Sequence, residues 1–232
     1  GGDTLQIRHY ADLFGLLTNN YANLQLDKDI VRMLNIKYVI VGGNMFDIIF
    51  KEANNSVTIL QQDTYRPRIF FVSKATVLNG KNEIFSKLSD VNFSPFNEII
   101  IEGAENEINT LPIEKVDKIN YVINNIDYRP NQVTIDFNLE DNGFLVMSDT
   151  YYPGWKAYID NKETRIYKTD YAIRSIFVEK GTHKAAFIYD PISFKAGAFV
   201  TILSLTILGI WGIFLMFRYL VNKNMNLHRS NY

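Results

Sequence analysis

The sequence predicts an α+β extracytoplasmic region that ends in an antiparallel β-sandwich and is followed by one transmembrane helix. Three observations support this fold class. Helical and strand patterns mix over residues 1–103, strands with short turns follow over residues 118–193, and residues 196–217 form an uncharged apolar run. The expected divisions are a small α+β layer (1–103), a linker (104–117), a β-sandwich (118–193), a transmembrane helix (194–218) and a basic cytoplasmic tail (219–232).

The apolar run at residues 196–217 has no charged side chain and lies between Lys195 and Arg218. About 20 apolar residues in a helix span the roughly 30 Å hydrocarbon core of a bilayer. The alternative is a buried helix of a soluble core, but core helices are seldom apolar on every face over this length. The run therefore predicts one membrane-spanning helix, with the lipid bilayer as a partner.

The residues after the apolar run indicate how the helix is oriented. Arg218, Lys223 and Arg229 come without any Asp or Glu before the C-terminus, and a short basic tail favours the cytoplasm. We therefore expect a cytoplasmic C-terminus at a bacterial cell membrane, with the bulk of the chain extracytoplasmic. Because the sequence begins Gly-Gly-Asp without a signal peptide, we also expect N-terminal membrane helices of the same protein to precede it.

Composition disfavours several classes of protein. The formal net charge is −1 and no basic patch interleaves with aromatic residues, so no nucleic acid is expected as a partner. The absence of cysteine excludes disulfides and thiolate metal sites and suits a bacterial surface. His9, His183 and His228 show no metal-ligand spacing. We expect neither a metal nor a cofactor.

Residues 1–103 combine helices with short strands. Periodic apolar residues predict a helix over the first 20 residues and a second over 27–34, which Asn35 ends in a left-handed conformation. A third, amphipathic helix is predicted over 81–88. Strands are predicted at residues 38–41, 57–60, 69–72 and 98–101. The polar and acidic residues that follow Gly103 favour a linker.

Residues 118–193 have the pattern of a sandwich. Residues 132–139 alternate strictly between apolar and polar side chains. The apolar members, which we expect to face the core, are Val133, Ile135, Phe137 and Leu139. Asn142-Gly143 signals a hairpin turn, and further strands are predicted at residues 144–148, 155–159, 163–168, 172–178 and 184–189. About seven short antiparallel strands of this kind are typical of a β-sandwich.

Two groups of residues in the sandwich could carry chemistry. The carboxylates are Asp136, Asp149, Asp160, Asp170 and Asp190. Two of them could form a glycosidase pair, but Asp favours turns and strand edges, which is the interpretation we prefer. The aromatic cluster consists of Tyr151, Tyr152, Trp155 and Tyr158, and such rings bind sugars or lie at membrane interfaces. Trp155 shares a strand face with Ala157 and Ile159, so we expect it in the core.

A longer stretch of the chain resembles a known family. Residues 148–194 read SDTYYPGWKAYIDNKETRIYKTDYAIRSIFVEKGTHKAAFIYDPISF and lead directly into the apolar run. The YYPGWKAYID core, the DYAIRSIFVEKGTHK stretch and the Pro-x-Ser-Phe that precedes the run resemble the C-terminal end of the bacterial YfhO family of membrane proteins. MLNIKYVI at residues 33–40 and GDTL at residues 2–5 with Tyr10 resemble blocks further upstream, so the resemblance covers most of the chain.

The resemblance implies a polytopic protein of the GT-C glycosyltransferase type. Such proteins take a sugar from a polyprenyl-phosphate donor and add it to a cell-envelope polymer, such as lipoteichoic acid, outside the membrane. In that fold the catalytic carboxylate lies in an early extracytoplasmic loop between membrane helices. This loop is not present in the sequence, so no catalytic residue is carried over.

We therefore expect the chain to be the non-catalytic C-terminal part of such a lipid-linked-sugar-dependent glycosyltransferase, inactive by itself. Polyprenyl-phosphate sugar and an envelope polymer would be its partners. The residues expected to contact glycan or acceptor, as exposed aromatic and cationic groups, are Tyr151, Tyr152, Tyr158, Tyr171 and Arg174. Two alternatives are a membrane-tethered glycan- or protein-binding ectodomain without enzymatic activity, and a structural ectodomain that orders a larger membrane assembly.

Overall fold

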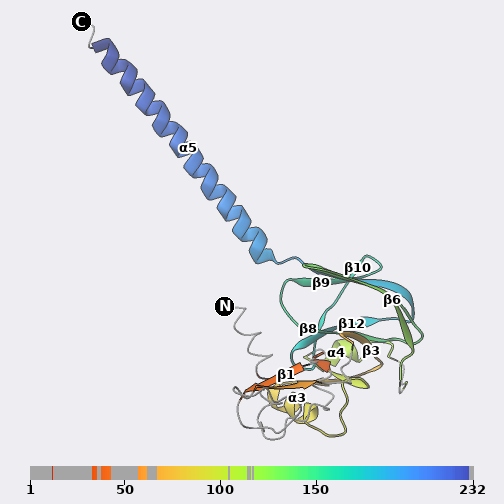
Figure 1. Ribbon diagram of the computed structural model, residues 1–232. Coiled ribbons are helices and arrows are strands. Elements are labelled where there is room, and N and C mark those ends of the chain that lie inside the picture. Colours follow the sequence, from red (N-terminus) through yellow and green to blue (C-terminus); the bar gives the residue numbers. More distant parts are fainter. Residues whose placement is uncertain are drawn as a thin grey trace. The chain divides into compact units, whose positions relative to one another are not determined.

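A computed structural model of the chain (Figure 1) describes residues 12, 33–35, 38–42, 57–61, 67–103, 105–113, 116 and 118–229. Gly1–Tyr189 form one compact unit, and Asp190–Tyr232 form a second. The first unit contains two large β-sheets, and the described part of the second is one long helix.

The larger sheet has six strands in the order β3-β8-β12-β11-β5-β4. The strands are β3 (Ile69–Val72), β8 (Gly143–Thr150), β12 (Ile173–Val178), β11 (Tyr167–Thr169), β5 (Glu98–Glu102) and β4 (Lys74–Leu78). Neighbouring strands are antiparallel except β4 and β5, which are parallel. Helix α3 (Lys81–Leu88) connects β4 to β5. Strands from both sides of residues 104–117, the segment predicted as a linker, share this sheet, and helix α4 (Glu105–Ile108) lies within that segment.

The second sheet has five antiparallel strands in the order β10-β9-β13-β7-β6. The strands are β10 (Lys162–Thr164), β9 (Trp155–Ile159), β13 (Gly181–Tyr189), β7 (Gln132–Leu139) and β6 (Tyr121–Arg129). In Figure 1, β9, β10 and β6 lie above β8, β12 and β3, so the two sheets form separate layers.

One apolar cluster fills the space between the two sheets. Ile135 and Phe137 of β7 meet Leu145 and Met147 of β8, and all four are fully buried. Phe71 of β3 packs on Phe137 with ring centroids 4.8 Å apart. The inward face predicted for residues 132–139 is therefore confirmed, and two sheets packed over one core make the β-sandwich of the predicted fold class.

A second apolar cluster covers the other face of the six-stranded sheet. Phe70 and Val146 of this sheet pack with Ile84 and Leu88 of α3 and with Met33. Strands of a sheet that is buried on both faces are largely apolar, because side chains on both faces are removed from water. This explains the unbroken apolar run of β3, and it confirms the mixture of helices and strands predicted for this part of the chain.

The structure differs from the predicted strands in two ways. The single strand predicted over residues 163–168 is wrong, because these residues belong to β10 and β11 of different sheets. Ile166 packs in the cluster between the sheets and Tyr167 in the other one, so the chain crosses from layer to layer at this point. β4 and β6 were not predicted; β6 carries a bulge between Ile123 and Asn125 that interrupts its alternation.

Some of the N-terminal predictions can be compared with the structure. β1 (Tyr38–Gly42) and β2 (Val57–Gln61) pair as a two-stranded antiparallel sheet, which confirms both strands. Asn35 has a φ angle of 55°, the left-handed conformation predicted for it. The helix predicted over the first 20 residues and most of the helix predicted over 27–34 lie outside the described residues.

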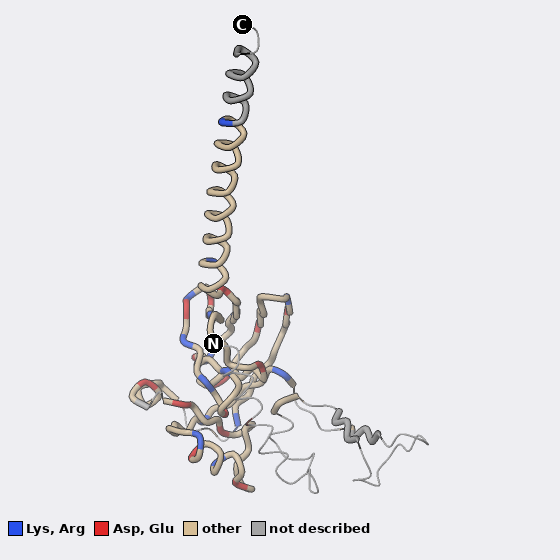
Figure 2. Tube along the Cα trace, turned by 90° about the vertical axis from the view of Figure 1, so that its left-hand side faces the viewer, with Lys and Arg blue, Asp and Glu red and all other residues tan. Residues whose placement is uncertain are grey.

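The second unit contains helix α5 (Ile192–Arg229). An 18-residue window within its stretch Ile192–Arg218 has a mean hydropathy of 2.3, and no side chain of the stretch is buried, so by length and composition it can cross a membrane. Figure 2 shows it uncharged between two basic positions, which are Lys195 and Arg218 in the sequence. The hydroxyls of Thr201, Ser204 and Thr206 donate to carbonyls one turn earlier at 2.8–2.9 Å, so the helix satisfies them internally. The helix predicted at residues 196–217 is confirmed.

Candidate functional site

The structural feature that distinguishes the sandwich is a buried arginine. Arg174 of β12 lies on the same strand face as Ile176 and Val178, whose side chains belong to the cluster between the sheets. A bulge between Ile173 and Arg174 shifts the register with β8 at this position. Only 1% of the Arg174 side chain is exposed. A cation buried in this way needs partners that replace its hydration.

The partners of Arg174 are two side chains of β8 and two aromatic rings. Its Nη2 donates to Asp149 Oδ2 at 2.6 Å and lies 3.2 Å from Met147 Sδ. Its guanidinium lies 4.1 Å from the ring centroid of Trp155 and 5.5 Å from that of Phe187, which are cation–π contacts. Its Nε has no hydrogen-bond partner among the described residues.

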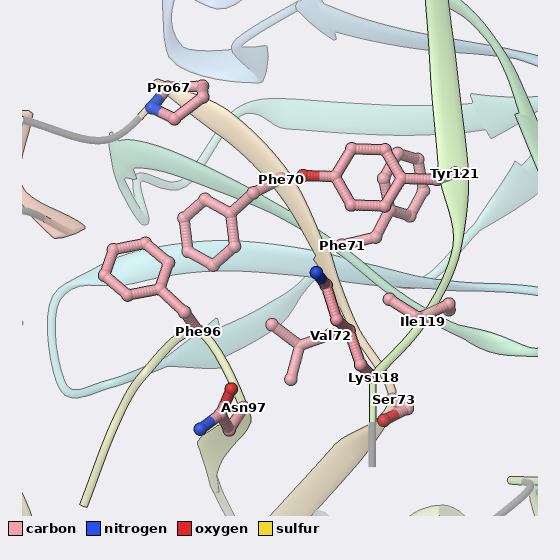
Figure 3. A pocket seen from close by; sticks show the side chains of 10 residues that line it. All are labelled: Pro67, Phe70, Phe71, Val72, Ser73, Phe96, Asn97, Lys118, Ile119 and Tyr121. Carbon is pink, nitrogen blue, oxygen red and sulfur yellow. The ribbon is translucent and has the colours of Figure 1, made fainter. Parts of the chain in front are cut away.

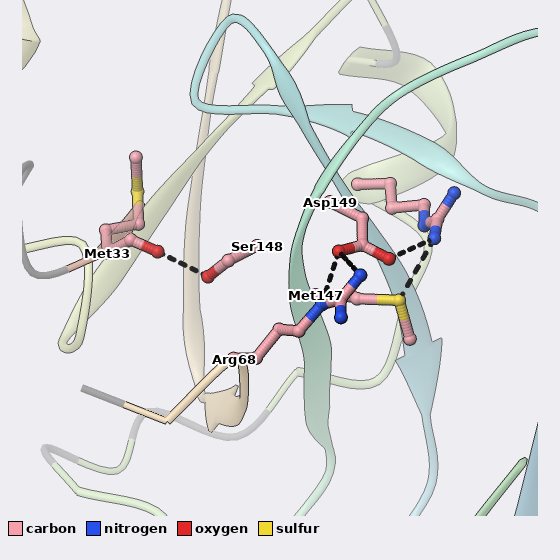
Figure 4. Close-up of polar contacts among 6 residues, drawn as sticks. Met33, Arg68, Met147, Ser148 and Asp149 are labelled. Atoms are coloured by element: carbon pink, nitrogen blue, oxygen red, sulfur yellow. Dashed lines mark hydrogen bonds and ion pairs between the residues drawn. The ribbon is translucent and has the colours of Figure 1, made fainter. Parts of the chain in front are cut away.

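Asp149 joins this buried arginine to a second one at the surface. Arg68, at the start of β3, donates from Nε to Asp149 Oδ1 at 2.5 Å. Figure 4 shows Asp149 on β8 between the two guanidinium groups. The guanidinium of Arg68 also lies 5.2 Å from the ring centroid of Tyr128 on β6. Two cations share one carboxylate, so the Arg68–Asp149–Arg174 cluster carries a formal charge of +1.

Burial changes the ionisation of this cluster. Loss of hydration lowers the pKa of Arg174 to about 10, although attraction to Asp149 opposes the decrease and repulsion by Arg68 adds to it. Arg174 therefore stays charged at neutral pH. The pKa of the Tyr128 hydroxyl is raised by burial, and the attraction of Arg68 partly offsets the increase. The cluster is a permanent positive site with Arg68 and Tyr128 at its exposed rim.

Trp155, at the end of the Tyr151-Tyr152-Pro153-Gly154-Trp155 segment between β8 and β9, covers Arg174. Gly154 has a φ angle of 100°, a conformation that glycine adopts without strain, and the turn carries Trp155 onto the guanidinium. Tyr189 packs on Trp155 with ring centroids 5.3 Å apart. Tyr152 packs on Tyr189 at 6.1 Å. Trp155 packs against the core as predicted, and it also shields the cation.

The five predicted contact residues do not form one site. Tyr151 and Tyr152 are half-buried beside Trp155, whereas Tyr158 is half-buried on the outer face of β9. Arg174 and Tyr171 are buried, so the expectation that they are exposed is wrong. Whether any of the five contacts a glycan stays a prediction.

Two local contacts explain the burial of Tyr171. It lies in the turn between β11 and β12, where Phe85 of α3 packs edge-on against its ring at 4.7 Å. Its hydroxyl donates to Asp12 Oδ2 at 3.0 Å. This turn faces the cluster on the outer side of the six-stranded sheet, so Tyr171 and Arg174 belong to different cores.

Sequence reasoning missed Asp149 as the partner of Arg174, and Arg68 as the second partner of Asp149. One signal was available. Arg174 precedes Ile176 and Val178 by two and four residues, so in a strand the three side chains lie on the same face and Arg174 must point inward with the other two. An inward arginine requires a carboxylate close by. The identity of that carboxylate depends on the order of strands in the sheet, which the sequence does not state.

The other aspartates have structural partners. Asp136 pairs with Lys184, Asp160 with His183 and Asp190 with Lys195. The pKa of Asp160 is lowered by hydrogen bonds from His183 and from the Lys184 amide. Asp170 is fully buried and accepts from the Ile100 amide at 2.8 Å. Asp160 and Asp170 lie in turns and Asp190 follows β13, as the preferred interpretation expects, whereas Asp136 lies within β7. The described part of the chain holds no group of three residues suited to a metal.

The fold and this cluster together define a β-sandwich protein with a buried arginine and a membrane-length helix directly after the last strand. A family model described as bacterial membrane protein YfhO matches residues 51–201. The chain belongs to the YfhO family, as its resemblance indicated.

One relative and the solved structures add to this comparison. The chain is 29% identical over 92 residues to a protein of Bacillus subtilis (strain 168) whose name is "Uncharacterized protein YfhO". The match covers 40% of this chain and 10% of the relative. No solved structure matches the chain.

Proposed function

We propose that this chain is the C-terminal, extracytoplasmic and non-catalytic part of a polytopic glycosyltransferase that uses a polyprenyl-phosphate sugar and acts on a cell-envelope polymer. Membership of a bacterial membrane protein family is the observation that carries the proposal. A membrane-length helix directly after the sandwich supports it. The Bacillus subtilis relative, of which the match covers 10%, leaves room for a separate catalytic region.

In this proposal the sandwich helps to hold the acceptor polymer. Tyr151, Tyr152 and Tyr158 are half-buried, and each keeps part of its ring accessible for stacking on sugars. Arg174 is buried and acts indirectly, because its contact with Trp155 supports the segment that carries Tyr151 and Tyr152. The chemistry itself belongs to membrane helices outside this chain.

Sugar transfer by the full-length protein tests this proposal. Membranes that contain it should transfer labelled sugar from a polyprenyl-phosphate donor to the envelope polymer, whereas this chain alone should not. The double variant Tyr152→Ala/Tyr158→Ala should raise the KM for acceptor and leave kcat nearly unchanged, because only acceptor binding is weakened. Val122→Ala, an exposed change on β6, is the control. Turnover by the isolated chain, or no effect on the acceptor KM, would contradict the corresponding part of the proposal.

The orientation of the helix belongs to the same proposal. The basic tail with Arg218, Lys223 and Arg229 would lie in the cytoplasm and the sandwich outside it. A cysteine placed in the tail should escape a membrane-impermeant thiol label in intact cells, whereas one placed at exposed Asn138 should react. The opposite labelling pattern would reverse the assignment.

A further inference from the structure

Strand β3 has an open edge. The Ser148 amide donates to the Arg68 carbonyl at 2.9 Å, and Phe70 is opposite Val146 in the same register. Because backbone bonding alternates along an antiparallel pair, the amides and carbonyls of Ile69 and Phe71 point away from β8. β3 lies at one edge of the six-stranded sheet, and no strand in the described part of the chain pairs with these groups.

A pocket of about 380 Å³ lies along this edge (Figure 3). Phe70 and Phe96 line it on one side of β3, with ring centroids 4.8 Å apart. Phe71 and Tyr121 line it on the other side, with ring centroids 4.9 Å apart. The pocket therefore offers apolar surface on both faces of the sheet, together with the backbone groups of the edge itself.

The two ends of this edge are cationic. The amine of Lys118 points into the pocket in Figure 3, and Lys118 has no ion-pair partner among the described residues. Ser73 donates to the Val116 carbonyl at 2.8 Å, which holds the segment before Lys118 beside the end of β3. Arg68 lies at the start of β3 in the cluster of formal charge +1. A negatively charged occupant is therefore favoured.

We propose that the edge of β3 binds an extended acidic peptide segment of a partner protein, which adds a strand to the six-stranded sheet. A strand supplies amides and carbonyls at every second residue, which is the spacing of the outward groups of Ile69 and Phe71. Its alternate side chains would enter the apolar surface on either side of β3. A sugar ring could stack on Phe96 or Tyr121, but it would not match this repeated backbone pattern.

Peptide binding to the full chain in detergent micelles tests the proposal. The probe is Glu-Val-Tyr-Val-Glu-amide with fluorescein on its N-terminal amine, and the readout is fluorescence anisotropy. Two N-methylated versions carry methyl groups on alternate amides, either at both Val residues or at Tyr. Since alternate amides face opposite edges of a strand, one version should bind like the parent and the other should lose binding. An oligoglucuronate of similar charge should not compete.

Charge variants provide a second test. Lys118→Glu should weaken binding of the acidic probe by about tenfold or more, and it should bind acetyl-Lys-Val-Tyr-Val-Lys-amide more tightly than the wild type does. Lys162→Glu on β10, an exposed lysine at an edge of the other sheet, is the matched control and should change neither affinity. Both variants should keep the wild-type thermal midpoint, which shows that the fold is intact.

Several results would overturn the proposal. They are equal binding of both N-methylated versions, no saturable binding of the acidic probe at about 1 mM, competition by the oligoglucuronate, and equal effects of the two lysine variants. The proposal does not depend on the glycosyltransferase proposal, because none of these measurements involves a sugar donor. Sugar transfer and peptide binding can therefore fail separately.

Discussion

At the scale of single residues, the sandwich depends on how it satisfies two buried ionisable groups. Arg174 has one carboxylate partner, Asp149, which it shares with Arg68. Asp170 has one hydrogen-bond donor to Oδ1, and its Oδ2 has no partner among the described residues. Removal of a charge should therefore affect the stability of the protein differently at these two groups.

Asp149→Asn should be more damaging than Arg174→Met. Asp149→Asn leaves the Arg174 cation buried without a counterion, which costs about 3–5 kcal/mol. Arg174→Met removes the cation itself, and Asp149 keeps its pair with Arg68, so the loss should be clearly smaller. Thermal unfolding of the full chain in detergent micelles measures the loss of stability in both variants. Equal losses would mean that the unpaired charge is not the cause.

Asp170 should make stability depend on pH. Burial raises the pKa of Asp170 to about 8, Glu98 adds to the increase and the Ile100 amide opposes it. The unfolded chain releases this proton near pH 4 and the folded chain near pH 8, so between these values the folded state binds more protons. Stability should then fall as pH rises, by at most about 1.4 kcal/mol per pH unit, and level off above the folded pKa.

Asp170→Asn should remove most of this dependence. Asn keeps the acceptor for the Ile100 amide, carries no titrating proton and tolerates the φ angle of 45° at this position. The variant should therefore show a flatter curve of thermal midpoint against pH and be the more stable protein near pH 8. A variant curve parallel to the wild-type curve would show that another group titrates.

At the scale of elements, β7 and α5 can each be tested by one substitution. β7 gives the sandwich a row of inward apolar side chains. The part of α5 over residues 196–217 has no charged side chain. The two elements therefore require different surroundings, protein interior for one face of β7 and lipid for this apolar part of α5.

Phe137→Ala should destabilise the sandwich by about 3–5 kcal/mol, since the ring is fully buried against Phe71 and leaves a cavity. Asn138→Ala, on the exposed face of the same strand, should change stability by less than about 1 kcal/mol. Denaturant unfolding in micelles compares them. Similar losses at both positions would contradict the inward register of β7.

Leu208→Arg should impair membrane insertion of α5. A charge at the middle of a membrane helix costs about 2.5–3.5 kcal/mol on insertion scales. Resistance to alkaline carbonate extraction should fall for this variant and remain for Leu208→Ala. When this chain is expressed alone, deletion of residues 195–232 should release the sandwich from membranes. Retention of the deleted form would show that the anchor lies elsewhere.

At the scale of the whole molecule, local patterns in the sequence predicted most elements but not how they meet. β3, α3 and β7 have the predicted bounds, because a continuous apolar run, a helical period and a strict alternation are each local signals. β6 was missed because its bulge breaks the alternation. The Arg68–Asp149 contact joins residues 81 positions apart, and only the strand order of the sheet brings them together.

The pairing of β3 with β8 also determines when the chain can fold. β3 must remain without its neighbour until β8 has been synthesised, and β8 in turn pairs with β12. Contacts between distant parts of a chain form slowly, because a long loop must close before they contribute any stability. We therefore expect the sandwich to form late in translation, when α5 is itself about to leave the ribosome. During that delay the apolar side chains of Ile69–Val72 are not yet buried and can aggregate with other chains. A chaperone that binds the unfolded chain would therefore have most effect at this stage.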